Sequence, residues 1–353
     1  MSQHPYRGLP DYQFWARAVA RVTPDDVDPV VAALFKIAPS DQVATSGSCF
    51  AQHISRALAR RGFSYLVTEQ GAAERNYGVF SARFGNIYTV RQLLQLFDRA
   101  YGLFEPAVDV WRREDGAYVD PFRPQVEPDG FASIEALRAD RRTHLAAVRA
   151  MFERCDVFVF TLGLTEGWIS AADGAVYPLA PGVAGAPAGE TSGATFVNFG
   201  VVEMAQDLTA FVEKLRAVRP QARVILTVSP VPLVATYEPR HVLVSTVYSK
   251  SALRVVADMV IRSVSDVAYF PSYEIITGAH NGNRYFEADL RSIRPEGVDN
   301  VMRLFLQHYG GEGENAPPRQ RQASTDAHAL SEAEAQLRDL NKVICDEEAL
   351  DAQ

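Results

Sequence analysis

Two β-rich runs, residues 156–161 and 223–228, constrain the fold of this chain more than any other feature. An unbroken run of this kind is typical of a strand that is covered on both faces. The stretches before them, 134–154 and 200–218, carry apolar residues at helical spacing. Strands that alternate with helices at this spacing indicate βαβ units. We therefore predict an α/β fold of three layers, α/β/α, with a mainly parallel sheet.

The remaining elements follow from the same patterns and divide the chain into four parts. We predict an N-terminal arm with short helices over 1–40, a main domain over 41–310, a linker over 311–330, and a C-terminal helix and tail over 331–353. Further elements are predicted as helices over 12–22, 28–36, 88–101, 245–265 and 297–309, strands over 63–68 and 267–276, and hairpins over 111–122 and 168–179 that turn at Asp115-Gly116 and Asp173-Gly174.

Composition limits the partners and cofactors of the chain. A net charge of −8 argues against a nucleic-acid partner, because phosphate binding needs clustered lysine and arginine. The three cysteines are widely separated, and neither they nor the histidines form a metal-binding motif. No glycine-rich nucleotide motif follows the first strand. We therefore expect no metal and no cofactor. We find neither a signal peptide nor a membrane span, and expect a cytoplasmic protein.

The segment Ser46-Gly47-Ser48-Cys49 follows the short apolar run Val43-Ala44-Thr45 and predicts a strand, a tight turn and then a helix. Such a turn exposes a hydroxyl at the carboxyl end of a strand, where helix N–H groups can stabilise an oxyanion. Ser48 is therefore a candidate nucleophile. Two alternatives are that Ser48 only caps the helix, and that Cys49 is the nucleophile.

The pentapeptide Gly47-Ser48-Cys49-Phe50-Ala51 is the signature of the GSCFA family, which this chain resembles. GSCFA proteins in turn resemble SGNH (GDSL-type) ester hydrolases, whose serine follows the first strand. The resemblance extends over roughly residues 41–309. Other blocks that look like this family are Gly85-Asn86-Ile87-Tyr88, Ser229-Pro230-Val231, Ser249-Lys250 and Tyr269-Phe270-Pro271-Ser272-Tyr273-Glu274-Ile275.

The resemblance implies a base and an acid, but the chain departs from the family at the base. SGNH-type enzymes end with an Asp-x-x-His motif, and here Asp289 stands at the acid position while Ser292 replaces the histidine. Serine cannot accept a proton at neutral pH as an imidazole does. We rank His241 first and His280 second as replacement bases, because both follow strands on the expected edge of the sheet, and His53 third.

The oxyanion and substrate-binding positions are also implied by the resemblance. The family's Gly-x-Asn block is replaced by Gly163-Leu164-Thr165-Glu166, so an asparagine is missing there. Asn86, next to Gly85, is one substitute donor, and Thr165 is a second. The expected binding residues are Cys49, Gly85, Asn86, Gly163, Thr165 and Glu166.

Three functional hypotheses follow. The first is an ester hydrolase or O-acyl transferase that acts through a Ser48 acyl-enzyme on acyl esters, most plainly those of a carbohydrate, by analogy with the superfamily. The second is a non-catalytic relative that binds a glycan or acyl ligand, which the substitution at Ser292 favours. The third is an interaction protein that docks a protein partner through the C-terminal helix.

Overall fold

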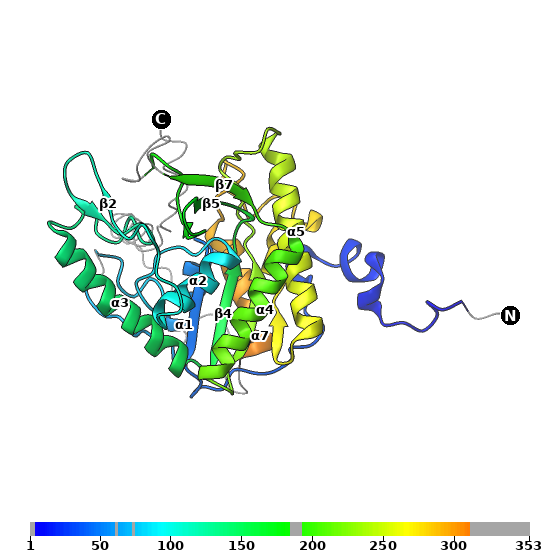
Figure 1. The fold of residues 1–353 in the computed structure, drawn as a ribbon. Coiled ribbons are helices and arrows are strands. Elements are labelled where there is room, and N and C mark those ends of the chain that lie inside the picture. Colours follow the sequence, from blue (N-terminus) through cyan, green and yellow to red (C-terminus); the bar gives the residue numbers. More distant parts are fainter. Residues whose placement is uncertain (1–3, 61–62, 73–74, 184–192, 311–353) are drawn as a thin grey trace, which may run out of the picture.

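The computed structural model describes residues 4–60, 63–72, 75–183 and 193–310, which form a central sheet between two layers of helices (Figure 1). The sheet has four parallel strands in the order β1-β4-β8-β9. Their bounds are Val43–Gly47, Val157–Leu162, Arg223–Val228 and Val267–Tyr269. Successive side chains of β4 enter opposite cores, since Phe158 and Phe160 pack on one face while Val157 and Val159 pack on the other.

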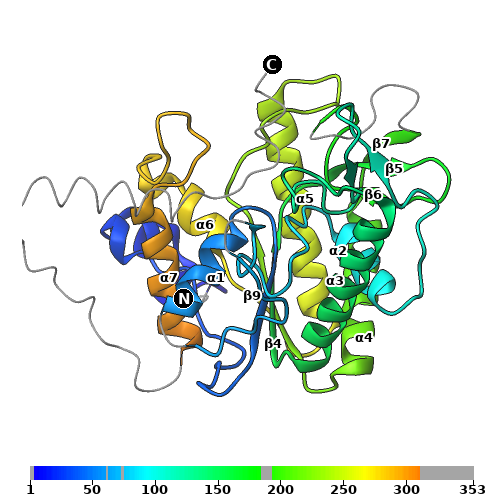
Figure 2. The ribbon, with the colours of Figure 1, turned by 90° about the vertical axis from the view of Figure 1, so that its left-hand side faces the viewer.

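The helices fall into two layers, which Figure 2 shows on either side of the sheet. One layer holds α2 (Val90–Ala100), α3 (Ile134–Arg154), α4 (Val201–Val218) and α5 (Val242–Ser263). The other holds α1 (Ala51–Arg60), α6 (Ser272–Thr277) and α7 (Pro295–Tyr309). The predicted α/β class with a mainly parallel sheet is confirmed. No helix in the described part of the chain is long and apolar enough to cross a membrane.

Two small antiparallel sheets lie outside the central one. The first pairs β2 (Trp111–Arg112) with β3 (Tyr118–Val119), and the second has the order β6-β5-β7, with bounds Val176–Tyr177, Glu166–Ser170 and Ala194–Asn198. Both predicted hairpins are therefore confirmed. Their turns use the predicted glycines, Gly116 and Gly174, which adopt φ values of 87° and 73°. The third strand of the second sheet, β7, was not predicted.

The N-terminal elements differ from the prediction. Instead of one helix over 12–22, the chain forms the 3-10 turn η1 (Asp11–Gln13) and the π turn η2 (Ala16–Ala20); η3 (Pro24–Asp26) follows. The helix predicted over 28–36 is wrong. Asp28 accepts a hydrogen bond from the N–H of Val30, and the N–H of Ile37 donates to the carbonyl of Tyr309 in α7. These contacts hold the segment in a non-helical form against α7.

Two predicted strands are shorter than expected. Residues 63–68 contribute a single bridge between Tyr65 and Val43. The strand predicted over 267–276 ends at Tyr269, because Pro271 cannot donate to the ladder and α6 begins at Ser272. The short 3-10 turn η6 (Ala279–Asn281) comes after α6. The predicted linker over 311–330 and C-terminal helix over 331–353 lie outside the described residues.

A buried histidine joins α3 to the loop that follows the bridge at Tyr65. Nδ1 of His144 shares a hydrogen bond of 2.7 Å with Oε2 of Glu69, and the N–H of Arg83 donates to the same oxygen. His144 is fully buried. Burial, and then the positive charge of Arg123, lower the pKa of His144 to about 4. The ring is therefore neutral in the folded protein at neutral pH.

This pKa predicts how stability depends on pH. The unfolded chain binds a proton at His144 near pH 6.5, whereas the folded chain binds it only near pH 4, so acidification between these values favours the unfolded state. We expect the free energy of unfolding to fall by about 3 kcal/mol across this window. Urea denaturation at a series of pH values measures it. The variant His144→Gln should show a flatter profile over the same range, and an unchanged slope would contradict the assignment to His144.

Candidate active site

The end of β1 brings two backbones unusually close together. Gly47 has φ of 144°, and a side-chain carbon built on it would lie 2.5 Å from the carbonyl oxygen of Thr161 in β4. Only glycine fits this position without strain. The next residue, Ser48, donates its backbone N–H to the same Thr161 oxygen at 3.3 Å. The strand therefore turns at Gly47 as predicted, although α1 begins at Ala51 rather than at Cys49.

Ser48 is buried beneath the chain at this turn. The residue is 3% exposed, and its hydroxyl oxygen has no hydrogen-bond partner among the described residues. Gly163, directly after β4, packs against it, since a side-chain carbon on Gly163 would lie 3.0 Å from Cβ of Ser48. Leaving a buried hydroxyl unsatisfied costs free energy. The hydroxyl of Ser46 shares this property, so Ser48 is a candidate for function because it also stands at the turn after β1, next to Gly163.

Two backbone N–H groups converge on one oxygen beside Gly163, the residue that packs on Ser48. The N–H groups of Gly163 and Leu164 both donate to the carbonyl oxygen of Tyr88, at 3.2 and 2.9 Å. A side-chain carbon built on Gly163 would lie 3.0 Å from this Tyr88 oxygen. It would also lie 3.0 Å from Cβ of Ser48. The two N–H groups form a two-donor site for one oxygen atom. The carbonyl oxygen of Tyr88 occupies this site.

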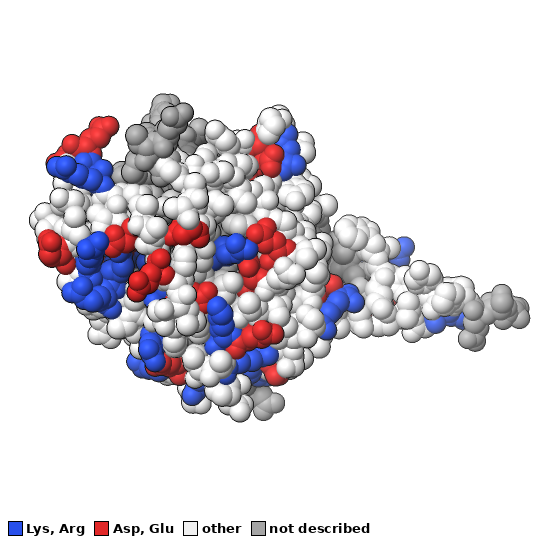
Figure 3. Space-filling model, in the orientation of Figure 1, with Lys and Arg blue, Asp and Glu red and all other residues white. Residues whose placement is uncertain are grey.

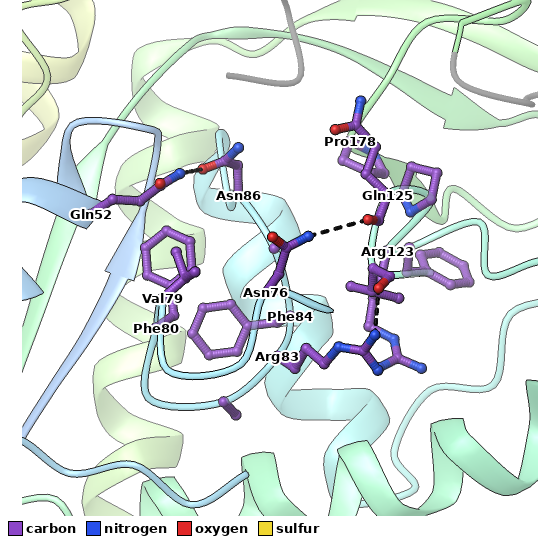
Figure 4. Close-up of a pocket in the computed structure, with 15 residues that line it drawn as sticks. Gln52, Asn76, Val79, Phe80, Arg83, Phe84, Asn86, Arg123, Gln125 and Pro178 are labelled. Carbon is purple, nitrogen blue, oxygen red and sulfur yellow. Dashed lines mark hydrogen bonds between the residues drawn. The ribbon is translucent and has the colours of Figure 1, made fainter. Parts of the chain in front are cut away.

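Gly85 and Asn86 lie on the segment that covers Ser48. The N–H of Ile87 donates to the carbonyl of Gly47 at 2.8 Å, which fixes this segment on the end of β1. Asn86 is buried, and its Oδ1 accepts a hydrogen bond of 3.0 Å from Nε2 of Gln52, one turn after Ser48 on α1 (Figure 4). The two amides border a cavity of about 30 Å³. The structure thus brings Gly85, Asn86 and Gly163 to the edge of the sheet where Ser48 lies.

Helix α5 contributes a lysine to the same region. Lys250 is 1% exposed, and its Nζ donates to the carbonyl of Gly163 at 2.7 Å. Its neighbour Ser249 accepts a hydrogen bond of 3.2 Å from the N–H of Thr165. The hydroxyl of Thr165 is buried without a partner among the described residues. No chemistry was predicted for Lys250 from the sequence, where it stands between Ser249 and Ser251.

The predicted acid and bases form no hydrogen bond with Ser48 among the described residues. His241 is exposed and caps α5, with its Nδ1 accepting the N–H of Leu243. His280 lies half-buried in η6, where burial and Arg284 lower its pKa. Asp289 is exposed. None of these three side chains forms a hydrogen bond with the hydroxyl of Ser48 in the described part of the chain.

Asp289 and Ser292 form a turn with each other. The carboxylate accepts the hydroxyl of Ser292 at 2.6 Å, together with the N–H groups of Arg291 and Ser292. Burial raises the pKa of Asp289, but these hydrogen bonds outweigh it and lower the pKa below its usual value.

Two other predicted residues lie close to Ser48 in the chain. Cys49, the alternative nucleophile, is 5% exposed. His53, the third-ranked base, packs its ring against Phe50.

Glu166 belongs to a larger cavity beside this cluster. Its carboxylate accepts the hydroxyl of Thr236 at 2.6 Å and the N–H of Tyr237 at 3.1 Å. The cavity measures about 150 Å³. Trp168, Phe196 and Tyr237 form part of its wall, with ring centroids 4.8 to 5.7 Å apart. Tyr88 and Leu164 also line it, and therefore connect it with the two-donor site. This aromatic cavity was not predicted.

The profile of the GSCFA family matches residues 42–305. The chain belongs to the GSCFA family. No curated protein and no solved structure matches the sequence. The GSCFA match spans the sheet, Ser48, Lys250 and both cavities. Within the described residues of this GSCFA protein, no group of three or more histidine, cysteine or acidic side chains is placed to hold a metal ion.

The contact at Gly47 yields a prediction for the GSCFA turn. We expect Gly47→Ala to lower the free energy of unfolding by about 3 kcal/mol or more, because the added carbon meets the backbone of Thr161 in a strained conformation. Gly102→Ala is the matched control, since Gly102 also has positive φ but open space around it, and should cost about 1 kcal/mol. Chemical denaturation of both variants measures the difference. Equal losses would contradict the packing argument.

Proposed function

We propose that this GSCFA protein is a serine ester hydrolase or O-acyl transferase that forms an acyl-enzyme at Ser48. The observation that carries the proposal is the buried Ser48 hydroxyl, which has no partner among the described residues, beside Gly163, whose N–H converges with that of Leu164 on a single oxygen. A hydroxyl and a donor pair around one reacting atom are the parts that acyl transfer requires. The likeness of GSCFA proteins to SGNH hydrolases supports the same chemistry.

In this mechanism the Ser48 oxygen attacks the carbonyl carbon of an ester, and its proton passes to a base. The developing oxyanion takes the place of the Tyr88 carbonyl, where the N–H groups of Gly163 and Leu164 donate to it. Collapse of the intermediate releases the alcohol, which takes the proton. Water or a sugar hydroxyl then attacks the acyl-enzyme and frees Ser48. The segment that carries Tyr88 has to move away from Ser48 to admit the ester.

The aromatic cavity supports a small substrate. About 150 Å³ is the size of an engineered cavity that binds benzene, so it suits a short acyl group or one sugar ring and not a long lipid chain. The faces of Trp168, Phe196 and Tyr237 are apolar, while Glu166 offers a carboxylate at the same wall. Such a mixture of apolar faces and few polar groups is usual for ligand pockets. It supports an acylated carbohydrate as the substrate class.

We propose Lys250 as the base in place of the histidines. Its Nζ donates to the carbonyl of Gly163, which packs on Ser48, and like the histidines it forms no hydrogen bond with the Ser48 hydroxyl among the described residues, so the base would reach Ser48 only when the ester binds. Serine paired with lysine is a known variant of the serine triad. His241 caps α5 and faces solvent, which does not suit this role.

Labelling with a fluorophosphonate probe tests the nucleophile. We expect Ser48→Ala to abolish labelling and to lower the turnover of p-nitrophenyl acetate by at least about a thousandfold. Ser46→Ala is the matched control, because Ser46 is equally buried and its hydroxyl also has no partner among the described residues. This control should label as the wild type does. Equal labelling of Ser48→Ala and wild type would exclude an acyl-enzyme at Ser48.

A panel of three variants tests the base. We expect Lys250→Met to lose labelling by at least about a hundredfold, since Ser48 then has no group to take its proton. His241→Ala and His280→Ala should both keep near wild-type rates. Lys250→Arg preserves the positive charge but cannot act as a base at neutral pH, and it should fail as Lys250→Met does. Loss of labelling confined to His241→Ala would instead restore the histidine as the base.

A second candidate function is a non-catalytic protein that binds an acyl or glycan ligand in the aromatic cavity. The observation that favours it is that the N–H groups of Ser48 and Gly163 are already used, by the carbonyls of Thr161 and Tyr88. Quenching of Trp168 fluorescence by acetylated sugars, with no fluorophosphonate labelling of the wild type, would support binding alone.

The hypothesis that the C-terminal helix docks a protein partner has its own test. It predicts that truncation after Gly310 abolishes function.

A further inference from the structure

Two arginines, Arg99 and Arg123, are buried with N–H groups that lack an acceptor. Arg99 stands in the last turn of α2 and is 9% exposed, while Arg123 follows β3 and is 3% exposed. Nη2 of Arg99 and Nη1 of Arg123 have no hydrogen-bond partner among the described residues. Burying a charged group without such a partner costs more free energy than burying a neutral one. The pair is therefore a candidate site for an acceptor that is not part of the chain.

Both arginines line one small cavity beside α2. The cavity measures about 10 Å³, which is room for one particle the size of a water molecule. The guanidinium of Arg99 lies over the ring of Phe122, with 3.8 Å between its central carbon and the ring centroid. Because Phe122 also lines the cavity, this contact fixes the guanidinium at the wall.

The other polar side chains of the wall already accept hydrogen bonds. They are Gln92 and Gln95 of α2. Oε1 of Gln92 accepts the N–H of Tyr88 at 2.9 Å, and Oε1 of Gln95 accepts the N–H of Val176 at 2.8 Å. A buried water molecule has to donate hydrogen bonds as well as accept them, whereas an anion only accepts. The unpaired donors on the wall therefore favour an anion.

The charges around the cavity point to the same kind of ligand. Arg123 pairs with Asp120 at 3.0 Å and with Asp140 at 2.5 Å. Arg99 forms no ion pair within the described residues. Burial lowers the pKa of Arg99 to about 10, and the positive charges of Arg141 and Arg123 act in the same direction, while Asp120 opposes this shift. Arg99 is therefore charged at neutral pH. On the face of the domain drawn in Figure 3, lysine and arginine side chains lie next to acidic ones, so Arg99 differs from these surface residues.

We propose that Arg99 and Arg123 bind a chloride ion in this cavity. Guanidinium N–H groups form strong, charge-assisted hydrogen bonds with anions, and an anion beside Arg99 supplies the counter-ion that this residue lacks. Chloride is a single atom, as the volume requires, whereas a carboxylate or a phosphate group has three heavy atoms or more. The cavity is not lined by Ser48, Lys250 or Gly163, so the site is separate from the proposed acyl-transfer chemistry.

The chloride site lies behind the segment that covers Ser48. Phe84 and Ile87 of this segment both line the cavity. Gln92 joins the wall to the same segment, since its Nε2 donates to the carbonyl of Asn86 at 3.1 Å. An ion in the cavity therefore packs against the segment and holds it in place.

Anomalous diffraction locates the ion directly. Crystals of the full-length protein are grown in sodium chloride and in sodium bromide, and the anomalous signal of each halide is measured. We expect a halide peak within hydrogen-bond distance of Nη2 of Arg99 and Nη1 of Arg123. A water molecule without anomalous signal at this position in both crystals would overturn the proposal.

Urea denaturation at constant ionic strength tests binding in solution. An ion that binds only the folded chain stabilises it as its concentration rises above the dissociation constant. We expect a higher midpoint for the wild type in sodium chloride than in sodium gluconate, and no difference for Arg99→Met. Arg91→Met is the matched control and should keep the difference, because Arg91 also lies on α2 and over a phenylalanine ring but does not line the cavity. Equal wild-type midpoints in the two salts would contradict chloride binding, whether or not Arg99→Met folds.

Hydrogen exchange followed by mass spectrometry tests the effect on the segment. We expect chloride, compared with gluconate, to slow exchange in peptides that cover residues 84–92 of the wild type but not of Arg99→Met. Exchange that chloride leaves unchanged in the wild type would show that the ion does not hold the segment. All three measurements use the protein without an ester, so their results do not depend on the chemistry proposed at Ser48.

Discussion

The contact between Gly47 and the carbonyl of Thr161 is the constraint on which the candidate site depends. Because Gly47 has no side chain, the ends of β1 and β4 can approach until Ser48 rests against Gly163. A series of hydrogen bonds extends from this point. The carbonyl of Gly47 accepts the N–H of Ile87, the carbonyl of Tyr88 accepts two N–H groups that follow β4, and the carbonyl of Gly163 accepts Lys250. One glycine thus positions groups from four separate parts of the chain.

The polar groups at this edge of the sheet contrast with the core around them. The hydroxyls of Ser48, Thr161 and Thr165 are buried without partners among the described residues, while the strands beneath them are apolar. Replacing such hydroxyls with apolar groups would make the core more stable. Proteins retain costs of this kind at functional sites. These unpaired hydroxyls lie near the carboxyl ends of parallel strands, where α/β proteins bind their ligands.

The sequence by itself determined the local elements: the sheet with its helical layers, the turns at Gly47, Gly116 and Gly174, and Ser48 at the end of the first strand. These depend on the spacing of apolar residues and on backbone freedom, which neighbouring residues set. Only the tertiary structure decided that residues 28–36 lie non-helical on α7, that β9 stops before Pro271, and that Lys250 reaches Gly163 while His241 faces solvent. Those outcomes depend on hydrogen bonds between residues far apart in the chain. A local sequence pattern does not predict which distant carbonyl a given N–H will bind.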